Sequence, residues 1–513
     1  MKYIFQMTLI LIILLNTISI AQERNIAKIG NINLSAEEFK QRFEFTPKVR
    51  SDFDSTKINF LYSLVAEKLW ALEAESLSMD TIPYVYNSVK NIERKLVKDK
   101  LYKIEVENKV LITEKEIAAN SFKIDQKRIM HFLYSKDQNE IERLYDDLIR
   151  SASFDSILVS RVEYSEQPKG VPVVFGQMDE DVENEIFSLK LNKFTKPIPV
   201  DVGWVVYYLK SIEYDQGENG LTAEAKRKKV KDILFARKAK TFYSEFFNKH
   251  ILGTVIHSDK QILNQLVDEV YNLFNDSGVK LYNKNNNKYQ MDEYQIKIIR
   301  NKFTQESLSS DFIKFEISPI SLEKYLINLE LNGFSCDDIT KDAIYKALNN
   351  NVKTYIFEEI LFREGYSRGL QNSVEVKNDL KTWRESFLAS YFRYSFLDSV
   401  EPNDSEAKEF YEKIVSENSD AVTETYDEVK EKIKSGLYFK ELENLYIDET
   451  VTLANKYGVT VDVELLKSIQ VTDIEMMVYR SLGFGGQITA VPYLQSFYKW
   501  KNWLPKSLKK SLP

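Results

Sequence analysis

This sequence of 513 residues is poor in cysteine and in histidine. Cys336 is the single cysteine, so the chain cannot close an intrachain disulfide even in an oxidising compartment. Three scattered histidines and one cysteine cannot supply the usual ligands of a structural zinc site. We therefore expect no metal and no cofactor, and a fold that is stabilised by packing.

The chain also lacks a segment in which one sign of charge predominates. Charged residues make up 29% of the sequence, both signs are interspersed, and the formal net charge is -7. A nucleic-acid-binding protein is expected to carry a basic stripe, so this pattern argues against a nucleic-acid partner, and we expect none. After the first residues, no run is long and apolar enough to span a bilayer, and we expect no stable insertion into a membrane.

Two glycine-rich patterns lack the companions that their chemistry requires. The stretch GYSRG (365–369) matches the nucleophile pattern of some hydrolases, but the last histidine of the chain, His257, precedes it. The stretch GFGGQ (483–487) lacks the third glycine of a dinucleotide-binding loop. Gly369 is better interpreted as the residue that follows the end of a helix.

The first residues read MKYIFQMTLILIILLNTISIAQERN, with Lys2 before an apolar run and the small residues Ser19 and Ala21 near its end. This pattern predicts a secretory signal peptide over residues 1–21 that is cleaved after Ala21. A retained membrane anchor would need about 20 apolar residues, and polar residues interrupt this run from Asn16 onward. No cysteine follows the run, which disfavours a lipid anchor. We expect a periplasmic or otherwise exported protein that is soluble after cleavage.

Residues 22–124 carry the pattern of a helical module. The stretch NIAKIGNINLSAEEFKQRF begins as a short β run and a turn, and Ser35 followed three residues later by Glu38 predicts a capping box that opens a helix. Apolar residues at helical spacing predict a second helix over about 57–76 and a third over about 83–106.

Residues 125–215 change to short β runs around one or two helices, which predicts an α+β domain. We interpret residues 216–300 as a helical segment and a linker. One long amphipathic helix is expected over LTAEAKRKKVKDILFARKAKTFYSEFFNKHI. The polar stretch YNKNNNKYQ (282–290) is the best candidate for the linker.

The second half of the chain repeats patterns of the first half. IGNINLSAEEF corresponds to FEISPISLEKY in the second half. EAESLSMD corresponds to EGYSRGLQ at an offset of 291 residues, and Thr195 corresponds to Thr489 at an offset of 294. These near-constant offsets predict a tandem duplication, with a second helical module over 312–415 and a degenerate second α+β module over 416–513. The predicted fold class is therefore an α+β multidomain protein with both kinds of module duplicated.

The same stretches resemble a known family. NIAKIGNINLSAEEFKQRF, LVAEKLWALEAESLSMD and VENKVLITEKEIAANSF look like the N-terminal chaperone module of secreted SurA-like and PrsA-like foldases. KRIMHFLYS through YYLKSIE, and GQMDEDVENEIFSL above all, resemble the parvulin (PpiC-type, rotamase) domain of these proteins. The resemblance covers about residues 25–250 and implies an exported peptidyl-prolyl cis-trans isomerase and folding chaperone.

The reaction that the resemblance implies is prolyl cis/trans isomerisation, whose barrier is about 18 to 20 kcal/mol. No covalent step is needed, because a pocket can hold the proline ring in an apolar cup, exclude water from the amide and favour the twisted state. Members of the family use two histidines, a cysteine or aspartate beside them, and a methionine and a phenylalanine that line the ring site.

Matched position by position, the resemblance assigns the first histidine to His131 and the methionine to Met178. The second histidine is replaced by Val205, the cysteine or aspartate by Gln167, and the phenylalanine by Val182. A valine covers less of a proline ring than a phenylalanine does, and Val205 cannot orient His131 by a hydrogen bond. The implied catalytic residue is therefore His131, in a degenerate pocket.

The substrate-binding residues that the resemblance implies are Met178, Val182, Phe187, Gln167 and Val205. Two simpler interpretations stay open, with His131 as a structural residue of its strand and Met178 as a core residue. The second copy has no candidate histidine, so we expect it to be non-catalytic.

Three functions remain open at this point. The protein could be a prolyl isomerase that accelerates folding, a holdase chaperone with an inactive parvulin domain, or a structural component of a surface or secretion assembly. The replaced pocket residues favour a chaperone of the foldase family with weak or absent isomerase activity. Its expected partners are unfolded or nascent exported polypeptides with apolar, aromatic and proline-containing segments.

Overall fold

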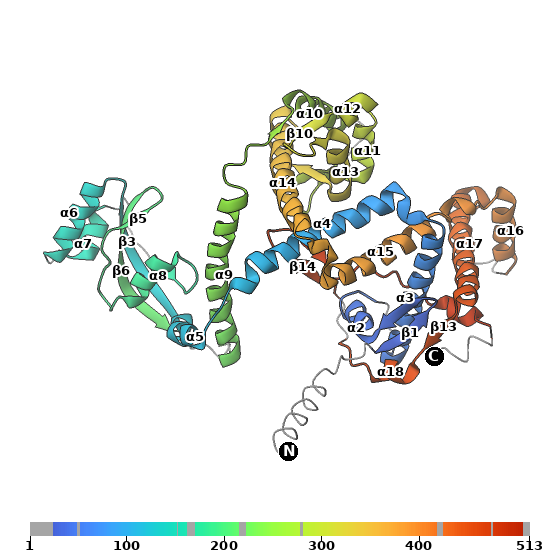
Figure 1. Ribbon diagram of the computed structural model, residues 1–513, viewed down its shortest axis with the longest axis horizontal. Coiled ribbons are helices and arrows are strands. Elements are labelled where there is room, and N and C mark those ends of the chain that lie inside the picture. The colour runs from blue at the N-terminus through green and yellow to red at the C-terminus, as the bar shows by residue number, and fades with distance from the viewer. Residues whose placement is uncertain are drawn as a thin grey trace, which may run out of the picture. The chain divides into compact units, whose positions relative to one another are not determined.

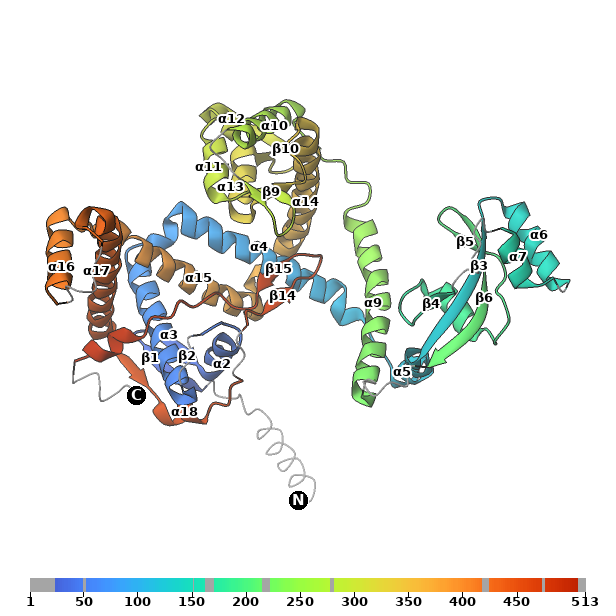
Figure 2. The same ribbon diagram turned by 180° about the vertical axis from the view of Figure 1, so that it is seen from behind.

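The computed structural model describes residues 24–48, 52–150, 152–161, 170–214, 222–276, 281–417, 424–472 and 476–505. The signal peptide predicted for residues 1–21 lies outside the described residues. The chain divides into two units, shown from opposite sides in Figures 1 and 2. Unit 1 comprises Met1–Leu101 and Val255–Pro513, and unit 2 comprises Tyr102–Thr254. Within the described residues, none of the helices combines the length and the apolar character that a membrane crossing requires.

Unit 1 begins with the predicted helical module. Its elements are β1 (Asn25–Ile29), β2 (Ile32–Ser35), α2 (Ala36–Glu44), α3 (Phe53–Ser76), η1 (Met79–Thr81) and α4 (Pro83–Glu105). The predicted start of α2 is confirmed, because the Ser35 hydroxyl accepts a hydrogen bond from the Glu38 amide at 3.1 Å. The predicted capping box is only half formed, since the carboxylate of Glu38 contacts Lys68 instead. α3 begins before its predicted start, since Asp52 caps it by accepting from the Ser55 amide at 3.0 Å. α3 is buried on nearly every side from Phe60 to Ala74, as expected for a central core helix.

The C-terminal part of the chain completes this first module. Its described elements are α16 (Asp404–Glu417), α17 (Tyr426–Tyr457), β13 (Val459–Val461), α18 (Val463–Ser468), β14 (Tyr479–Ser481), β15 (Gln487–Thr489) and η6 (Lys499–Trp503). β13 pairs antiparallel with β1, with Val461 opposite Ala27, and gives a sheet of order β13-β1-β2. Figure 2 shows β1 and β2 beside α3.

The prediction of a second parvulin-like module over 416–513 is therefore wrong for the described residues. Their strands pair only as β13 with β1 and as β14 with β15, so they form no four-stranded sheet. The physical reason is burial. Trp500 and Leu494 are buried in the core around α3, so tertiary packing outweighs the repeat pairing of Thr195 with Thr489 on which the prediction rested.

The middle of unit 1 has a core of its own. Its elements are β7 (His257–Ser258), α10 (Lys260–Asn275), β8 (Tyr282–Asn283), β9 (Lys288–Met291), α11 (Glu293–Arg300), α12 (Gln305–Ser309), β10 (Asp311–Lys314), β11 (Ile320–Ser321), α13 (Leu322–Asn332), β12 (Phe334–Cys336) and α14 (Lys341–Ser367). The predicted linker at 282–290 is instead the hairpin of β8 and β9, and β9 also pairs with β12. Asn287 adopts φ 54°, a left-handed conformation that asparagine tolerates better than most residues, which explains why a polar asparagine run forms a tight turn.

The helical order of the first module recurs in the second half of the chain. β10, β11, α13, α14, η4 (Leu370–Asn372) and α15 (Val374–Tyr394) follow in the order of β1, β2, α2, α3, η1 and α4, with β12 added. α3 ends at Ser76 and α14 at Ser367, 291 residues later. At the same offset, Ser78 and Gly369 are both left-handed, with φ 57° and 69°. The interpretation of Gly369 as a residue that follows a helix end is confirmed.

The helices of these two modules pack on each other in an exchanged arrangement, in which α3 of the first module lies against α15 of the second and α4 of the first lies against α14 of the second. Figure 1 shows α15 beside α3 and α4. In several cases, two residues of different modules are in contact, and the two residues that correspond to them at the offset of 291, one in each module, are in contact as well. Arg384 contacts Glu75 at 2.9 Å, and the positions that correspond to these two, Glu93 and Tyr366, are also hydrogen-bonded to each other. A second related pair consists of Tyr84 with Tyr391, whose ring centroids are 6.2 Å apart, and Lys100 with Glu375 at 2.6 Å.

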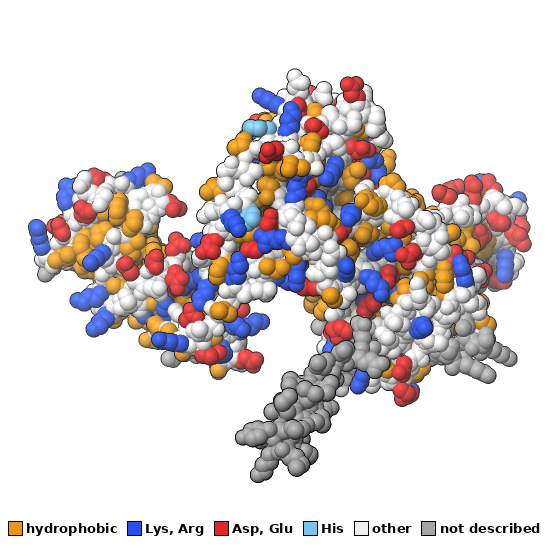
Figure 3. Space-filling view, viewed as in Figure 1, with side chains coloured by type: hydrophobic (Ala, Val, Ile, Leu, Met, Phe, Trp, Pro, Cys, Tyr) orange, Lys and Arg blue, Asp and Glu red, His pale blue; other side chains and the backbone are white. Residues whose placement is uncertain are grey.

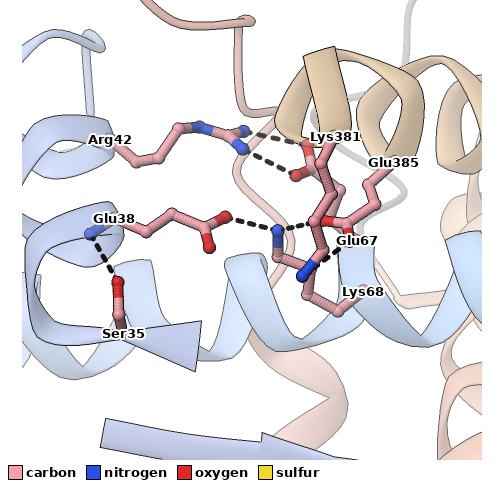
Figure 4. A network of polar contacts seen from close by, with 7 residues as sticks. All are labelled: Ser35, Glu38, Arg42, Glu67, Lys68, Lys381 and Glu385. Carbon is pink, nitrogen blue, oxygen red and sulfur yellow. Dashed lines mark hydrogen bonds and ion pairs between the residues drawn. The ribbon is translucent and has the colours of Figure 1, made fainter. Parts of the chain in front are cut away.

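A buried charge network joins α2, α3 and α15, as Figure 4 shows. Lys68 is fully buried and contacts the carboxylates of Glu38 and Glu385. Arg42 and Glu67 form two parallel hydrogen bonds of 2.9 and 3.0 Å beside it. Burial alone would lower the pKa of Lys68, but the carboxylates of Glu38 and Glu385 outweigh it and raise the pKa above its ordinary value.

Unit 2 contains the α+β domain predicted for residues 125–215 and the predicted long helix, and it also includes residues 102–124, which the sequence pattern assigned to the helical module. Its elements are η2 (Glu107–Lys109), α5 (Glu114–Ser121), η3 (Phe122–Asp125), β3 (Gln126–Ser135), α6 (Gln138–Ile149), α7 (Phe154–Ser160), β4 (Val171–Val173), α8 (Glu180–Ser188), β5 (Ile198–Val200), β6 (Gly203–Tyr214) and α9 (Ala223–His250). The strands form one antiparallel sheet of order β4-β3-β6-β5.

On the face of the molecule that Figure 3 shows, charged side chains of both signs are interspersed, as the composition predicted.

Candidate functional site

The central strands of unit 2, β3 and β6, divide their side chains between the two faces of the sheet. Phe132 lies opposite Tyr207, and His131 lies opposite Tyr208. Because successive side chains of a strand point to opposite faces, these two pairs lie on different faces. Met130, on the face of Phe132, packs in a core with residues of α8 and α9.

His131 lies on the face that α6 and α7 cover. Its cross-strand neighbour Tyr208 stacks on Phe154 of α7, with ring centroids 4.5 Å apart. The Nδ1 atom of His131 is 3.5 Å from Oδ1 of Asp155, and Lys210 pairs with the other oxygen of Asp155 at 2.6 Å. The hydrogen bond from Lys210, together with the charges of Lys210 and His131, holds the pKa of Asp155 below its ordinary value.

The opposite face of the sheet carries a pocket of about 340 Å³, called the sheet pocket below. Alternate residues of β3 and β6 form its floor, and the two edge strands and the turn before α8 form its walls. The lining residues are Met130, Phe132, Tyr134, Val171, Pro172, Val173, Gln177, Met178, Val200, Val205 and Tyr207. Burial raises the pKa of the Tyr207 hydroxyl, so this group is neutral near pH 7.

The structure brings two of the expected substrate-binding residues together, since Met178 and Val205 both line the sheet pocket. Val182 and Phe187 belong instead to the core between the sheet, α8 and α9, where Phe187 is 4% exposed. Gln167 lies outside the described residues.

The expected catalytic residue His131 is not among the residues that line the sheet pocket. It lies on the other face of the sheet, and Phe132 occupies the pocket face beside it. The register of β3 against β6 shifts at a bulge between Ile129 and Met130, directly before these residues. A bulge of this kind changes which side chains a strand presents to each face.

Residue-by-residue matching to a family pattern missed Phe132 and Tyr134, which are 44% and 39% exposed. The strand pattern contained a signal for them. In RIMHFLYS, the strict alternation of a β-strand places Met130, Phe132 and Tyr134 on one face and His131 on the other.

A buried ion pair fixes the turn that carries Met178. Gly176 has φ +90°, and a Cβ atom at this position would lie 2.8 Å from the side chain of Ile233, so only glycine fits. The fully buried carboxylate of Glu183 accepts a hydrogen bond from the Gly176 amide at 2.6 Å and pairs with Arg237 of α9 at 2.8 Å. These contacts hold the turn against α8 and α9, and so position Met178 at the pocket.

Unit 1 has a second hollow of about 640 Å³ between α3, α15, α17 and the segment after β15, called the aromatic hollow below. Tyr394, Phe439 and Tyr493 lie at it and are 65%, 65% and 58% exposed. Inside, the guanidinium of Arg393 lies 5.0 Å from the centroid of the Trp70 ring. Exposed aromatic side chains that gather at one hollow are typical of an interaction surface.

The arrangement of the sheet pocket suits binding better than proton transfer. Among its described lining residues, the polar groups are the amide of Gln177 and the hydroxyls of Tyr134 and Tyr207. The amide oxygen of Gln177 accepts from the Val174 amide at 3.2 Å, and the Tyr134 hydroxyl donates to the Val202 carbonyl. The remaining surface is an apolar cup. Within the described residues, no cluster of histidine, cysteine and carboxylate side chains could hold a metal ion.

No protein-family model matches the chain, and a search of curated proteins finds no match. Among solved structures, the chain is similar to PrsA proteins of three bacilli. The peptidylprolyl isomerase PrsA of Bacillus anthracis is 14% identical with a TM-score of 0.22, over 38% of this chain and 99% of that chain. The peptidylprolyl isomerase PrsA of Bacillus cereus is 15% identical with a TM-score of 0.21, over 46% of this chain and 95% of that chain. PrsA of Bacillus subtilis is 16% identical with a TM-score of 0.15, over 47% and 96%.

Proposed function

We propose that this protein is an exported folding chaperone of the parvulin foldase type, which binds unfolded polypeptide segments and isomerises prolyl bonds weakly or not at all. The observation that carries the proposal is the composition of the sheet pocket. Apart from the amide of Gln177 and two tyrosine hydroxyls, its described lining is apolar and aromatic, and it includes no imidazole, carboxylate or ammonium group. Such a cup can hold a proline ring or another apolar side chain by burial alone.

The edges of the same sheet support binding of an extended chain. β4 and β5 are edge strands, each with a single neighbour in the sheet. Val171 of β4 and Val200 of β5 both line the pocket. A polypeptide that adds to either edge by backbone hydrogen bonds would place its alternate side chains at the apolar cup.

Weak catalysis follows from what surrounds the pocket. An isomerase must bind the twisted amide more tightly than the planar one, and each 1.36 kcal/mol of that difference gives about tenfold in rate. The apolar cup holds the ring equally well in both states, and His131, on the opposite face, cannot reach a bound prolyl amide through the sheet.

The aromatic hollow of unit 1 supports a holdase role for the helical modules. Its exposed rings, Tyr394, Phe439 and Tyr493, offer apolar contact area to a client segment at low entropic cost. We therefore propose that clients are unfolded exported polypeptides with apolar, aromatic and proline-containing stretches. A purely structural role in a surface assembly is the alternative, and it predicts that neither pocket affects aggregation of an unfolded protein.

Export is part of the proposal and rests on the signal-peptide pattern of residues 1–21. The expected result is a periplasmic protein whose first residue is Gln22, and N-terminal sequencing of the exported protein measures this. A protein that keeps Met1 and fractionates with membranes would contradict it.

We also propose that the two helical modules arose by tandem duplication, without a second parvulin-like domain. The shared order of elements and the exchanged contacts at the offset of 291 support this proposal. An origin in two unrelated modules would give no reason for contacts to recur at one offset with the partners exchanged.

The substitution Phe132→Ser is expected to weaken suppression of aggregation. Phe132 lines the sheet pocket, and loss of a central aromatic contact costs more than 1 kcal/mol, so about fivefold more protein should be needed for half-suppression. Light scattering of a chemically unfolded client during dilution measures the effect. The matched control is Tyr214→Ser, because Tyr214 is an exposed aromatic residue of β6 that does not line the pocket. Equal effects of the two substitutions would contradict a role for the pocket.

Catalysis is tested with the wild type and with His131→Ala. A proline peptide should isomerise little faster with the protein than without it, and His131→Ala should leave both this rate and the suppression of aggregation unchanged, because His131 lies outside the sheet pocket. A protease-coupled assay of cis/trans exchange measures the rate. Robust isomerisation that His131→Ala abolishes would make the protein an ordinary parvulin enzyme.

A further inference from the structure

The two exchanged helix contacts of unit 1 each enclose a buried charge, and the two charges are opposite in sign. In the first network, the fully buried cation Lys68 of α3 contacts Glu38 of α2 and Glu385 of α15. In the second network, the anion Glu359 of α14 is 2% exposed. It contacts Arg94 of α4 at 2.5 Å and Lys324 of α13 at 4.0 Å.

The networks occupy the same positions of the two helical modules. Lys68 and Glu359 are separated by the offset of 291, and so are Arg94 and Glu385. The third members of the two networks, Glu38 and Lys324, correspond because each lies three residues after the serine that caps its helix. Ser35 accepts from the amide of Glu38, and Ser321 accepts in the same way from the amide of Lys324, three residues after each cap. Each of the three positions therefore carries one sign of charge in the first module and the opposite sign in the second.

This inversion decides which surfaces can pair. If the first module met a second copy of itself in the same way, Lys68 would face an arginine, the residue at position 94. If the second module met its own copy, Glu359 would face a glutamate, the residue at position 385. Like charges in a buried contact repel each other with little screening by water, and the counter-charges that remain within the same module, such as Glu38 or Lys324, no longer balance them.

We propose that the inverted networks make the exchanged interface selective, so that each helical module accepts the other module and rejects a second copy of itself. The partner that the interface fits is a module with the same helical shape and the opposite charge at three positions. Specific pairing commonly uses such repulsion against the wrong partner in addition to attraction for the right one. This proposal does not depend on the binding of polypeptides.

The test reproduces the rejected combinations in the full chain. In the variant Arg94→Glu, Glu359 faces a glutamate, as it would if the second module met its own copy. In Glu385→Arg, Lys68 faces an arginine in the same way. Each single variant is expected to lower the folding equilibrium constant of unit 1 about a hundredfold or more, measured by urea unfolding with far-UV circular dichroism.

The decisive variant combines Arg94→Glu, Lys324→Glu and Glu359→Lys, which copies the charges of the first network into the second. It is expected to recover at least tenfold of the loss caused by Arg94→Glu alone. Recovery is incomplete because Arg363, which pairs with Glu359 at 2.9 Å, would then lie beside a cation. Arg363 keeps its hydrogen bond to the Ser318 carbonyl at 2.6 Å.

The matched control is Lys100→Glu, the same change of sign on the same helix. Lys100 pairs with Glu375 across the same interface, but the two side chains are 24% and 41% exposed, so water screens the repulsion and less than a tenfold effect is expected. An Arg94→Glu effect as small as that of Lys100→Glu would overturn the proposal. A triple variant that is no more stable than Arg94→Glu, or that fails to fold, would overturn it too.

Discussion

Replacing Trp500 with alanine is expected to lower the free energy of unfolding of unit 1 by about 3 to 5 kcal/mol. Trp500 is fully buried although it lies near the end of the chain. Its ring packs edge-to-face on Tyr62 of α3 with centroids 5.3 Å apart, and its indole N–H donates to the Tyr62 carbonyl at 3.2 Å. The substitution would leave a cavity beside the central helix of the first module. Urea unfolding followed by far-UV circular dichroism measures the change.

The control for this prediction is Trp503→Ala. Trp503 belongs to the same short helix, η6, but its side chain is 55% exposed, so its removal creates no cavity. We expect a change within about 0.5 kcal/mol for this variant. Equal effects of the two substitutions would contradict the conclusion that the C-terminal segment is part of the core of the first module.

The second large effect is expected for Glu385→Ala, which should destabilise unit 1 by about 3 to 5 kcal/mol. The substitution removes one of the two carboxylates that contact the fully buried ammonium group of Lys68. Lys68 would stay buried, and burial lowers its pKa. It would also lose part of the negative charge that raises its pKa in the wild type. Because the folded pKa of Lys68 lies above its ordinary value, the network stabilises the fold below that value and loses its contribution as the pH rises through the folded pKa.

Glu375→Ala on the same helix is the matched control. Glu375 pairs with Lys100 at 2.6 Å, but its side chain is 41% exposed, and exposed ion pairs contribute about 0 to 1 kcal/mol. A Glu385→Ala effect of that size would mean that water reaches Lys68 and that the network does not hold α2, α3 and α15 together.

The sheet pocket illustrates how far a strand pattern reaches. The alternation in RIMHFLYS is sufficient to place Phe132 and Tyr134 on one face and His131 on the other, whereas matching of single residues to a family pattern selected His131. The strand pattern does not predict the position of the bulge beside Met130, because this position depends on how β3 pairs with β6. Met178 could be proposed from the sequence, but its position at the pocket depends on the buried pair of Glu183 and Arg237.

Local signals in the sequence determined the helices of the first module, the long helix α9 and the recurrence of the helical order in the second half. Caps such as Ser35, apolar spacing and a left-handed Gly369 act over a few residues, so they are readable without the fold. The pairing of β13 with β1, more than 400 residues away, and the packing of Trp500 against α3 cannot be read from the sequence. The same holds for the inverted charges at Lys68 and Glu359. These features depend on long-range packing and on the burial of charge, which no local pattern encodes.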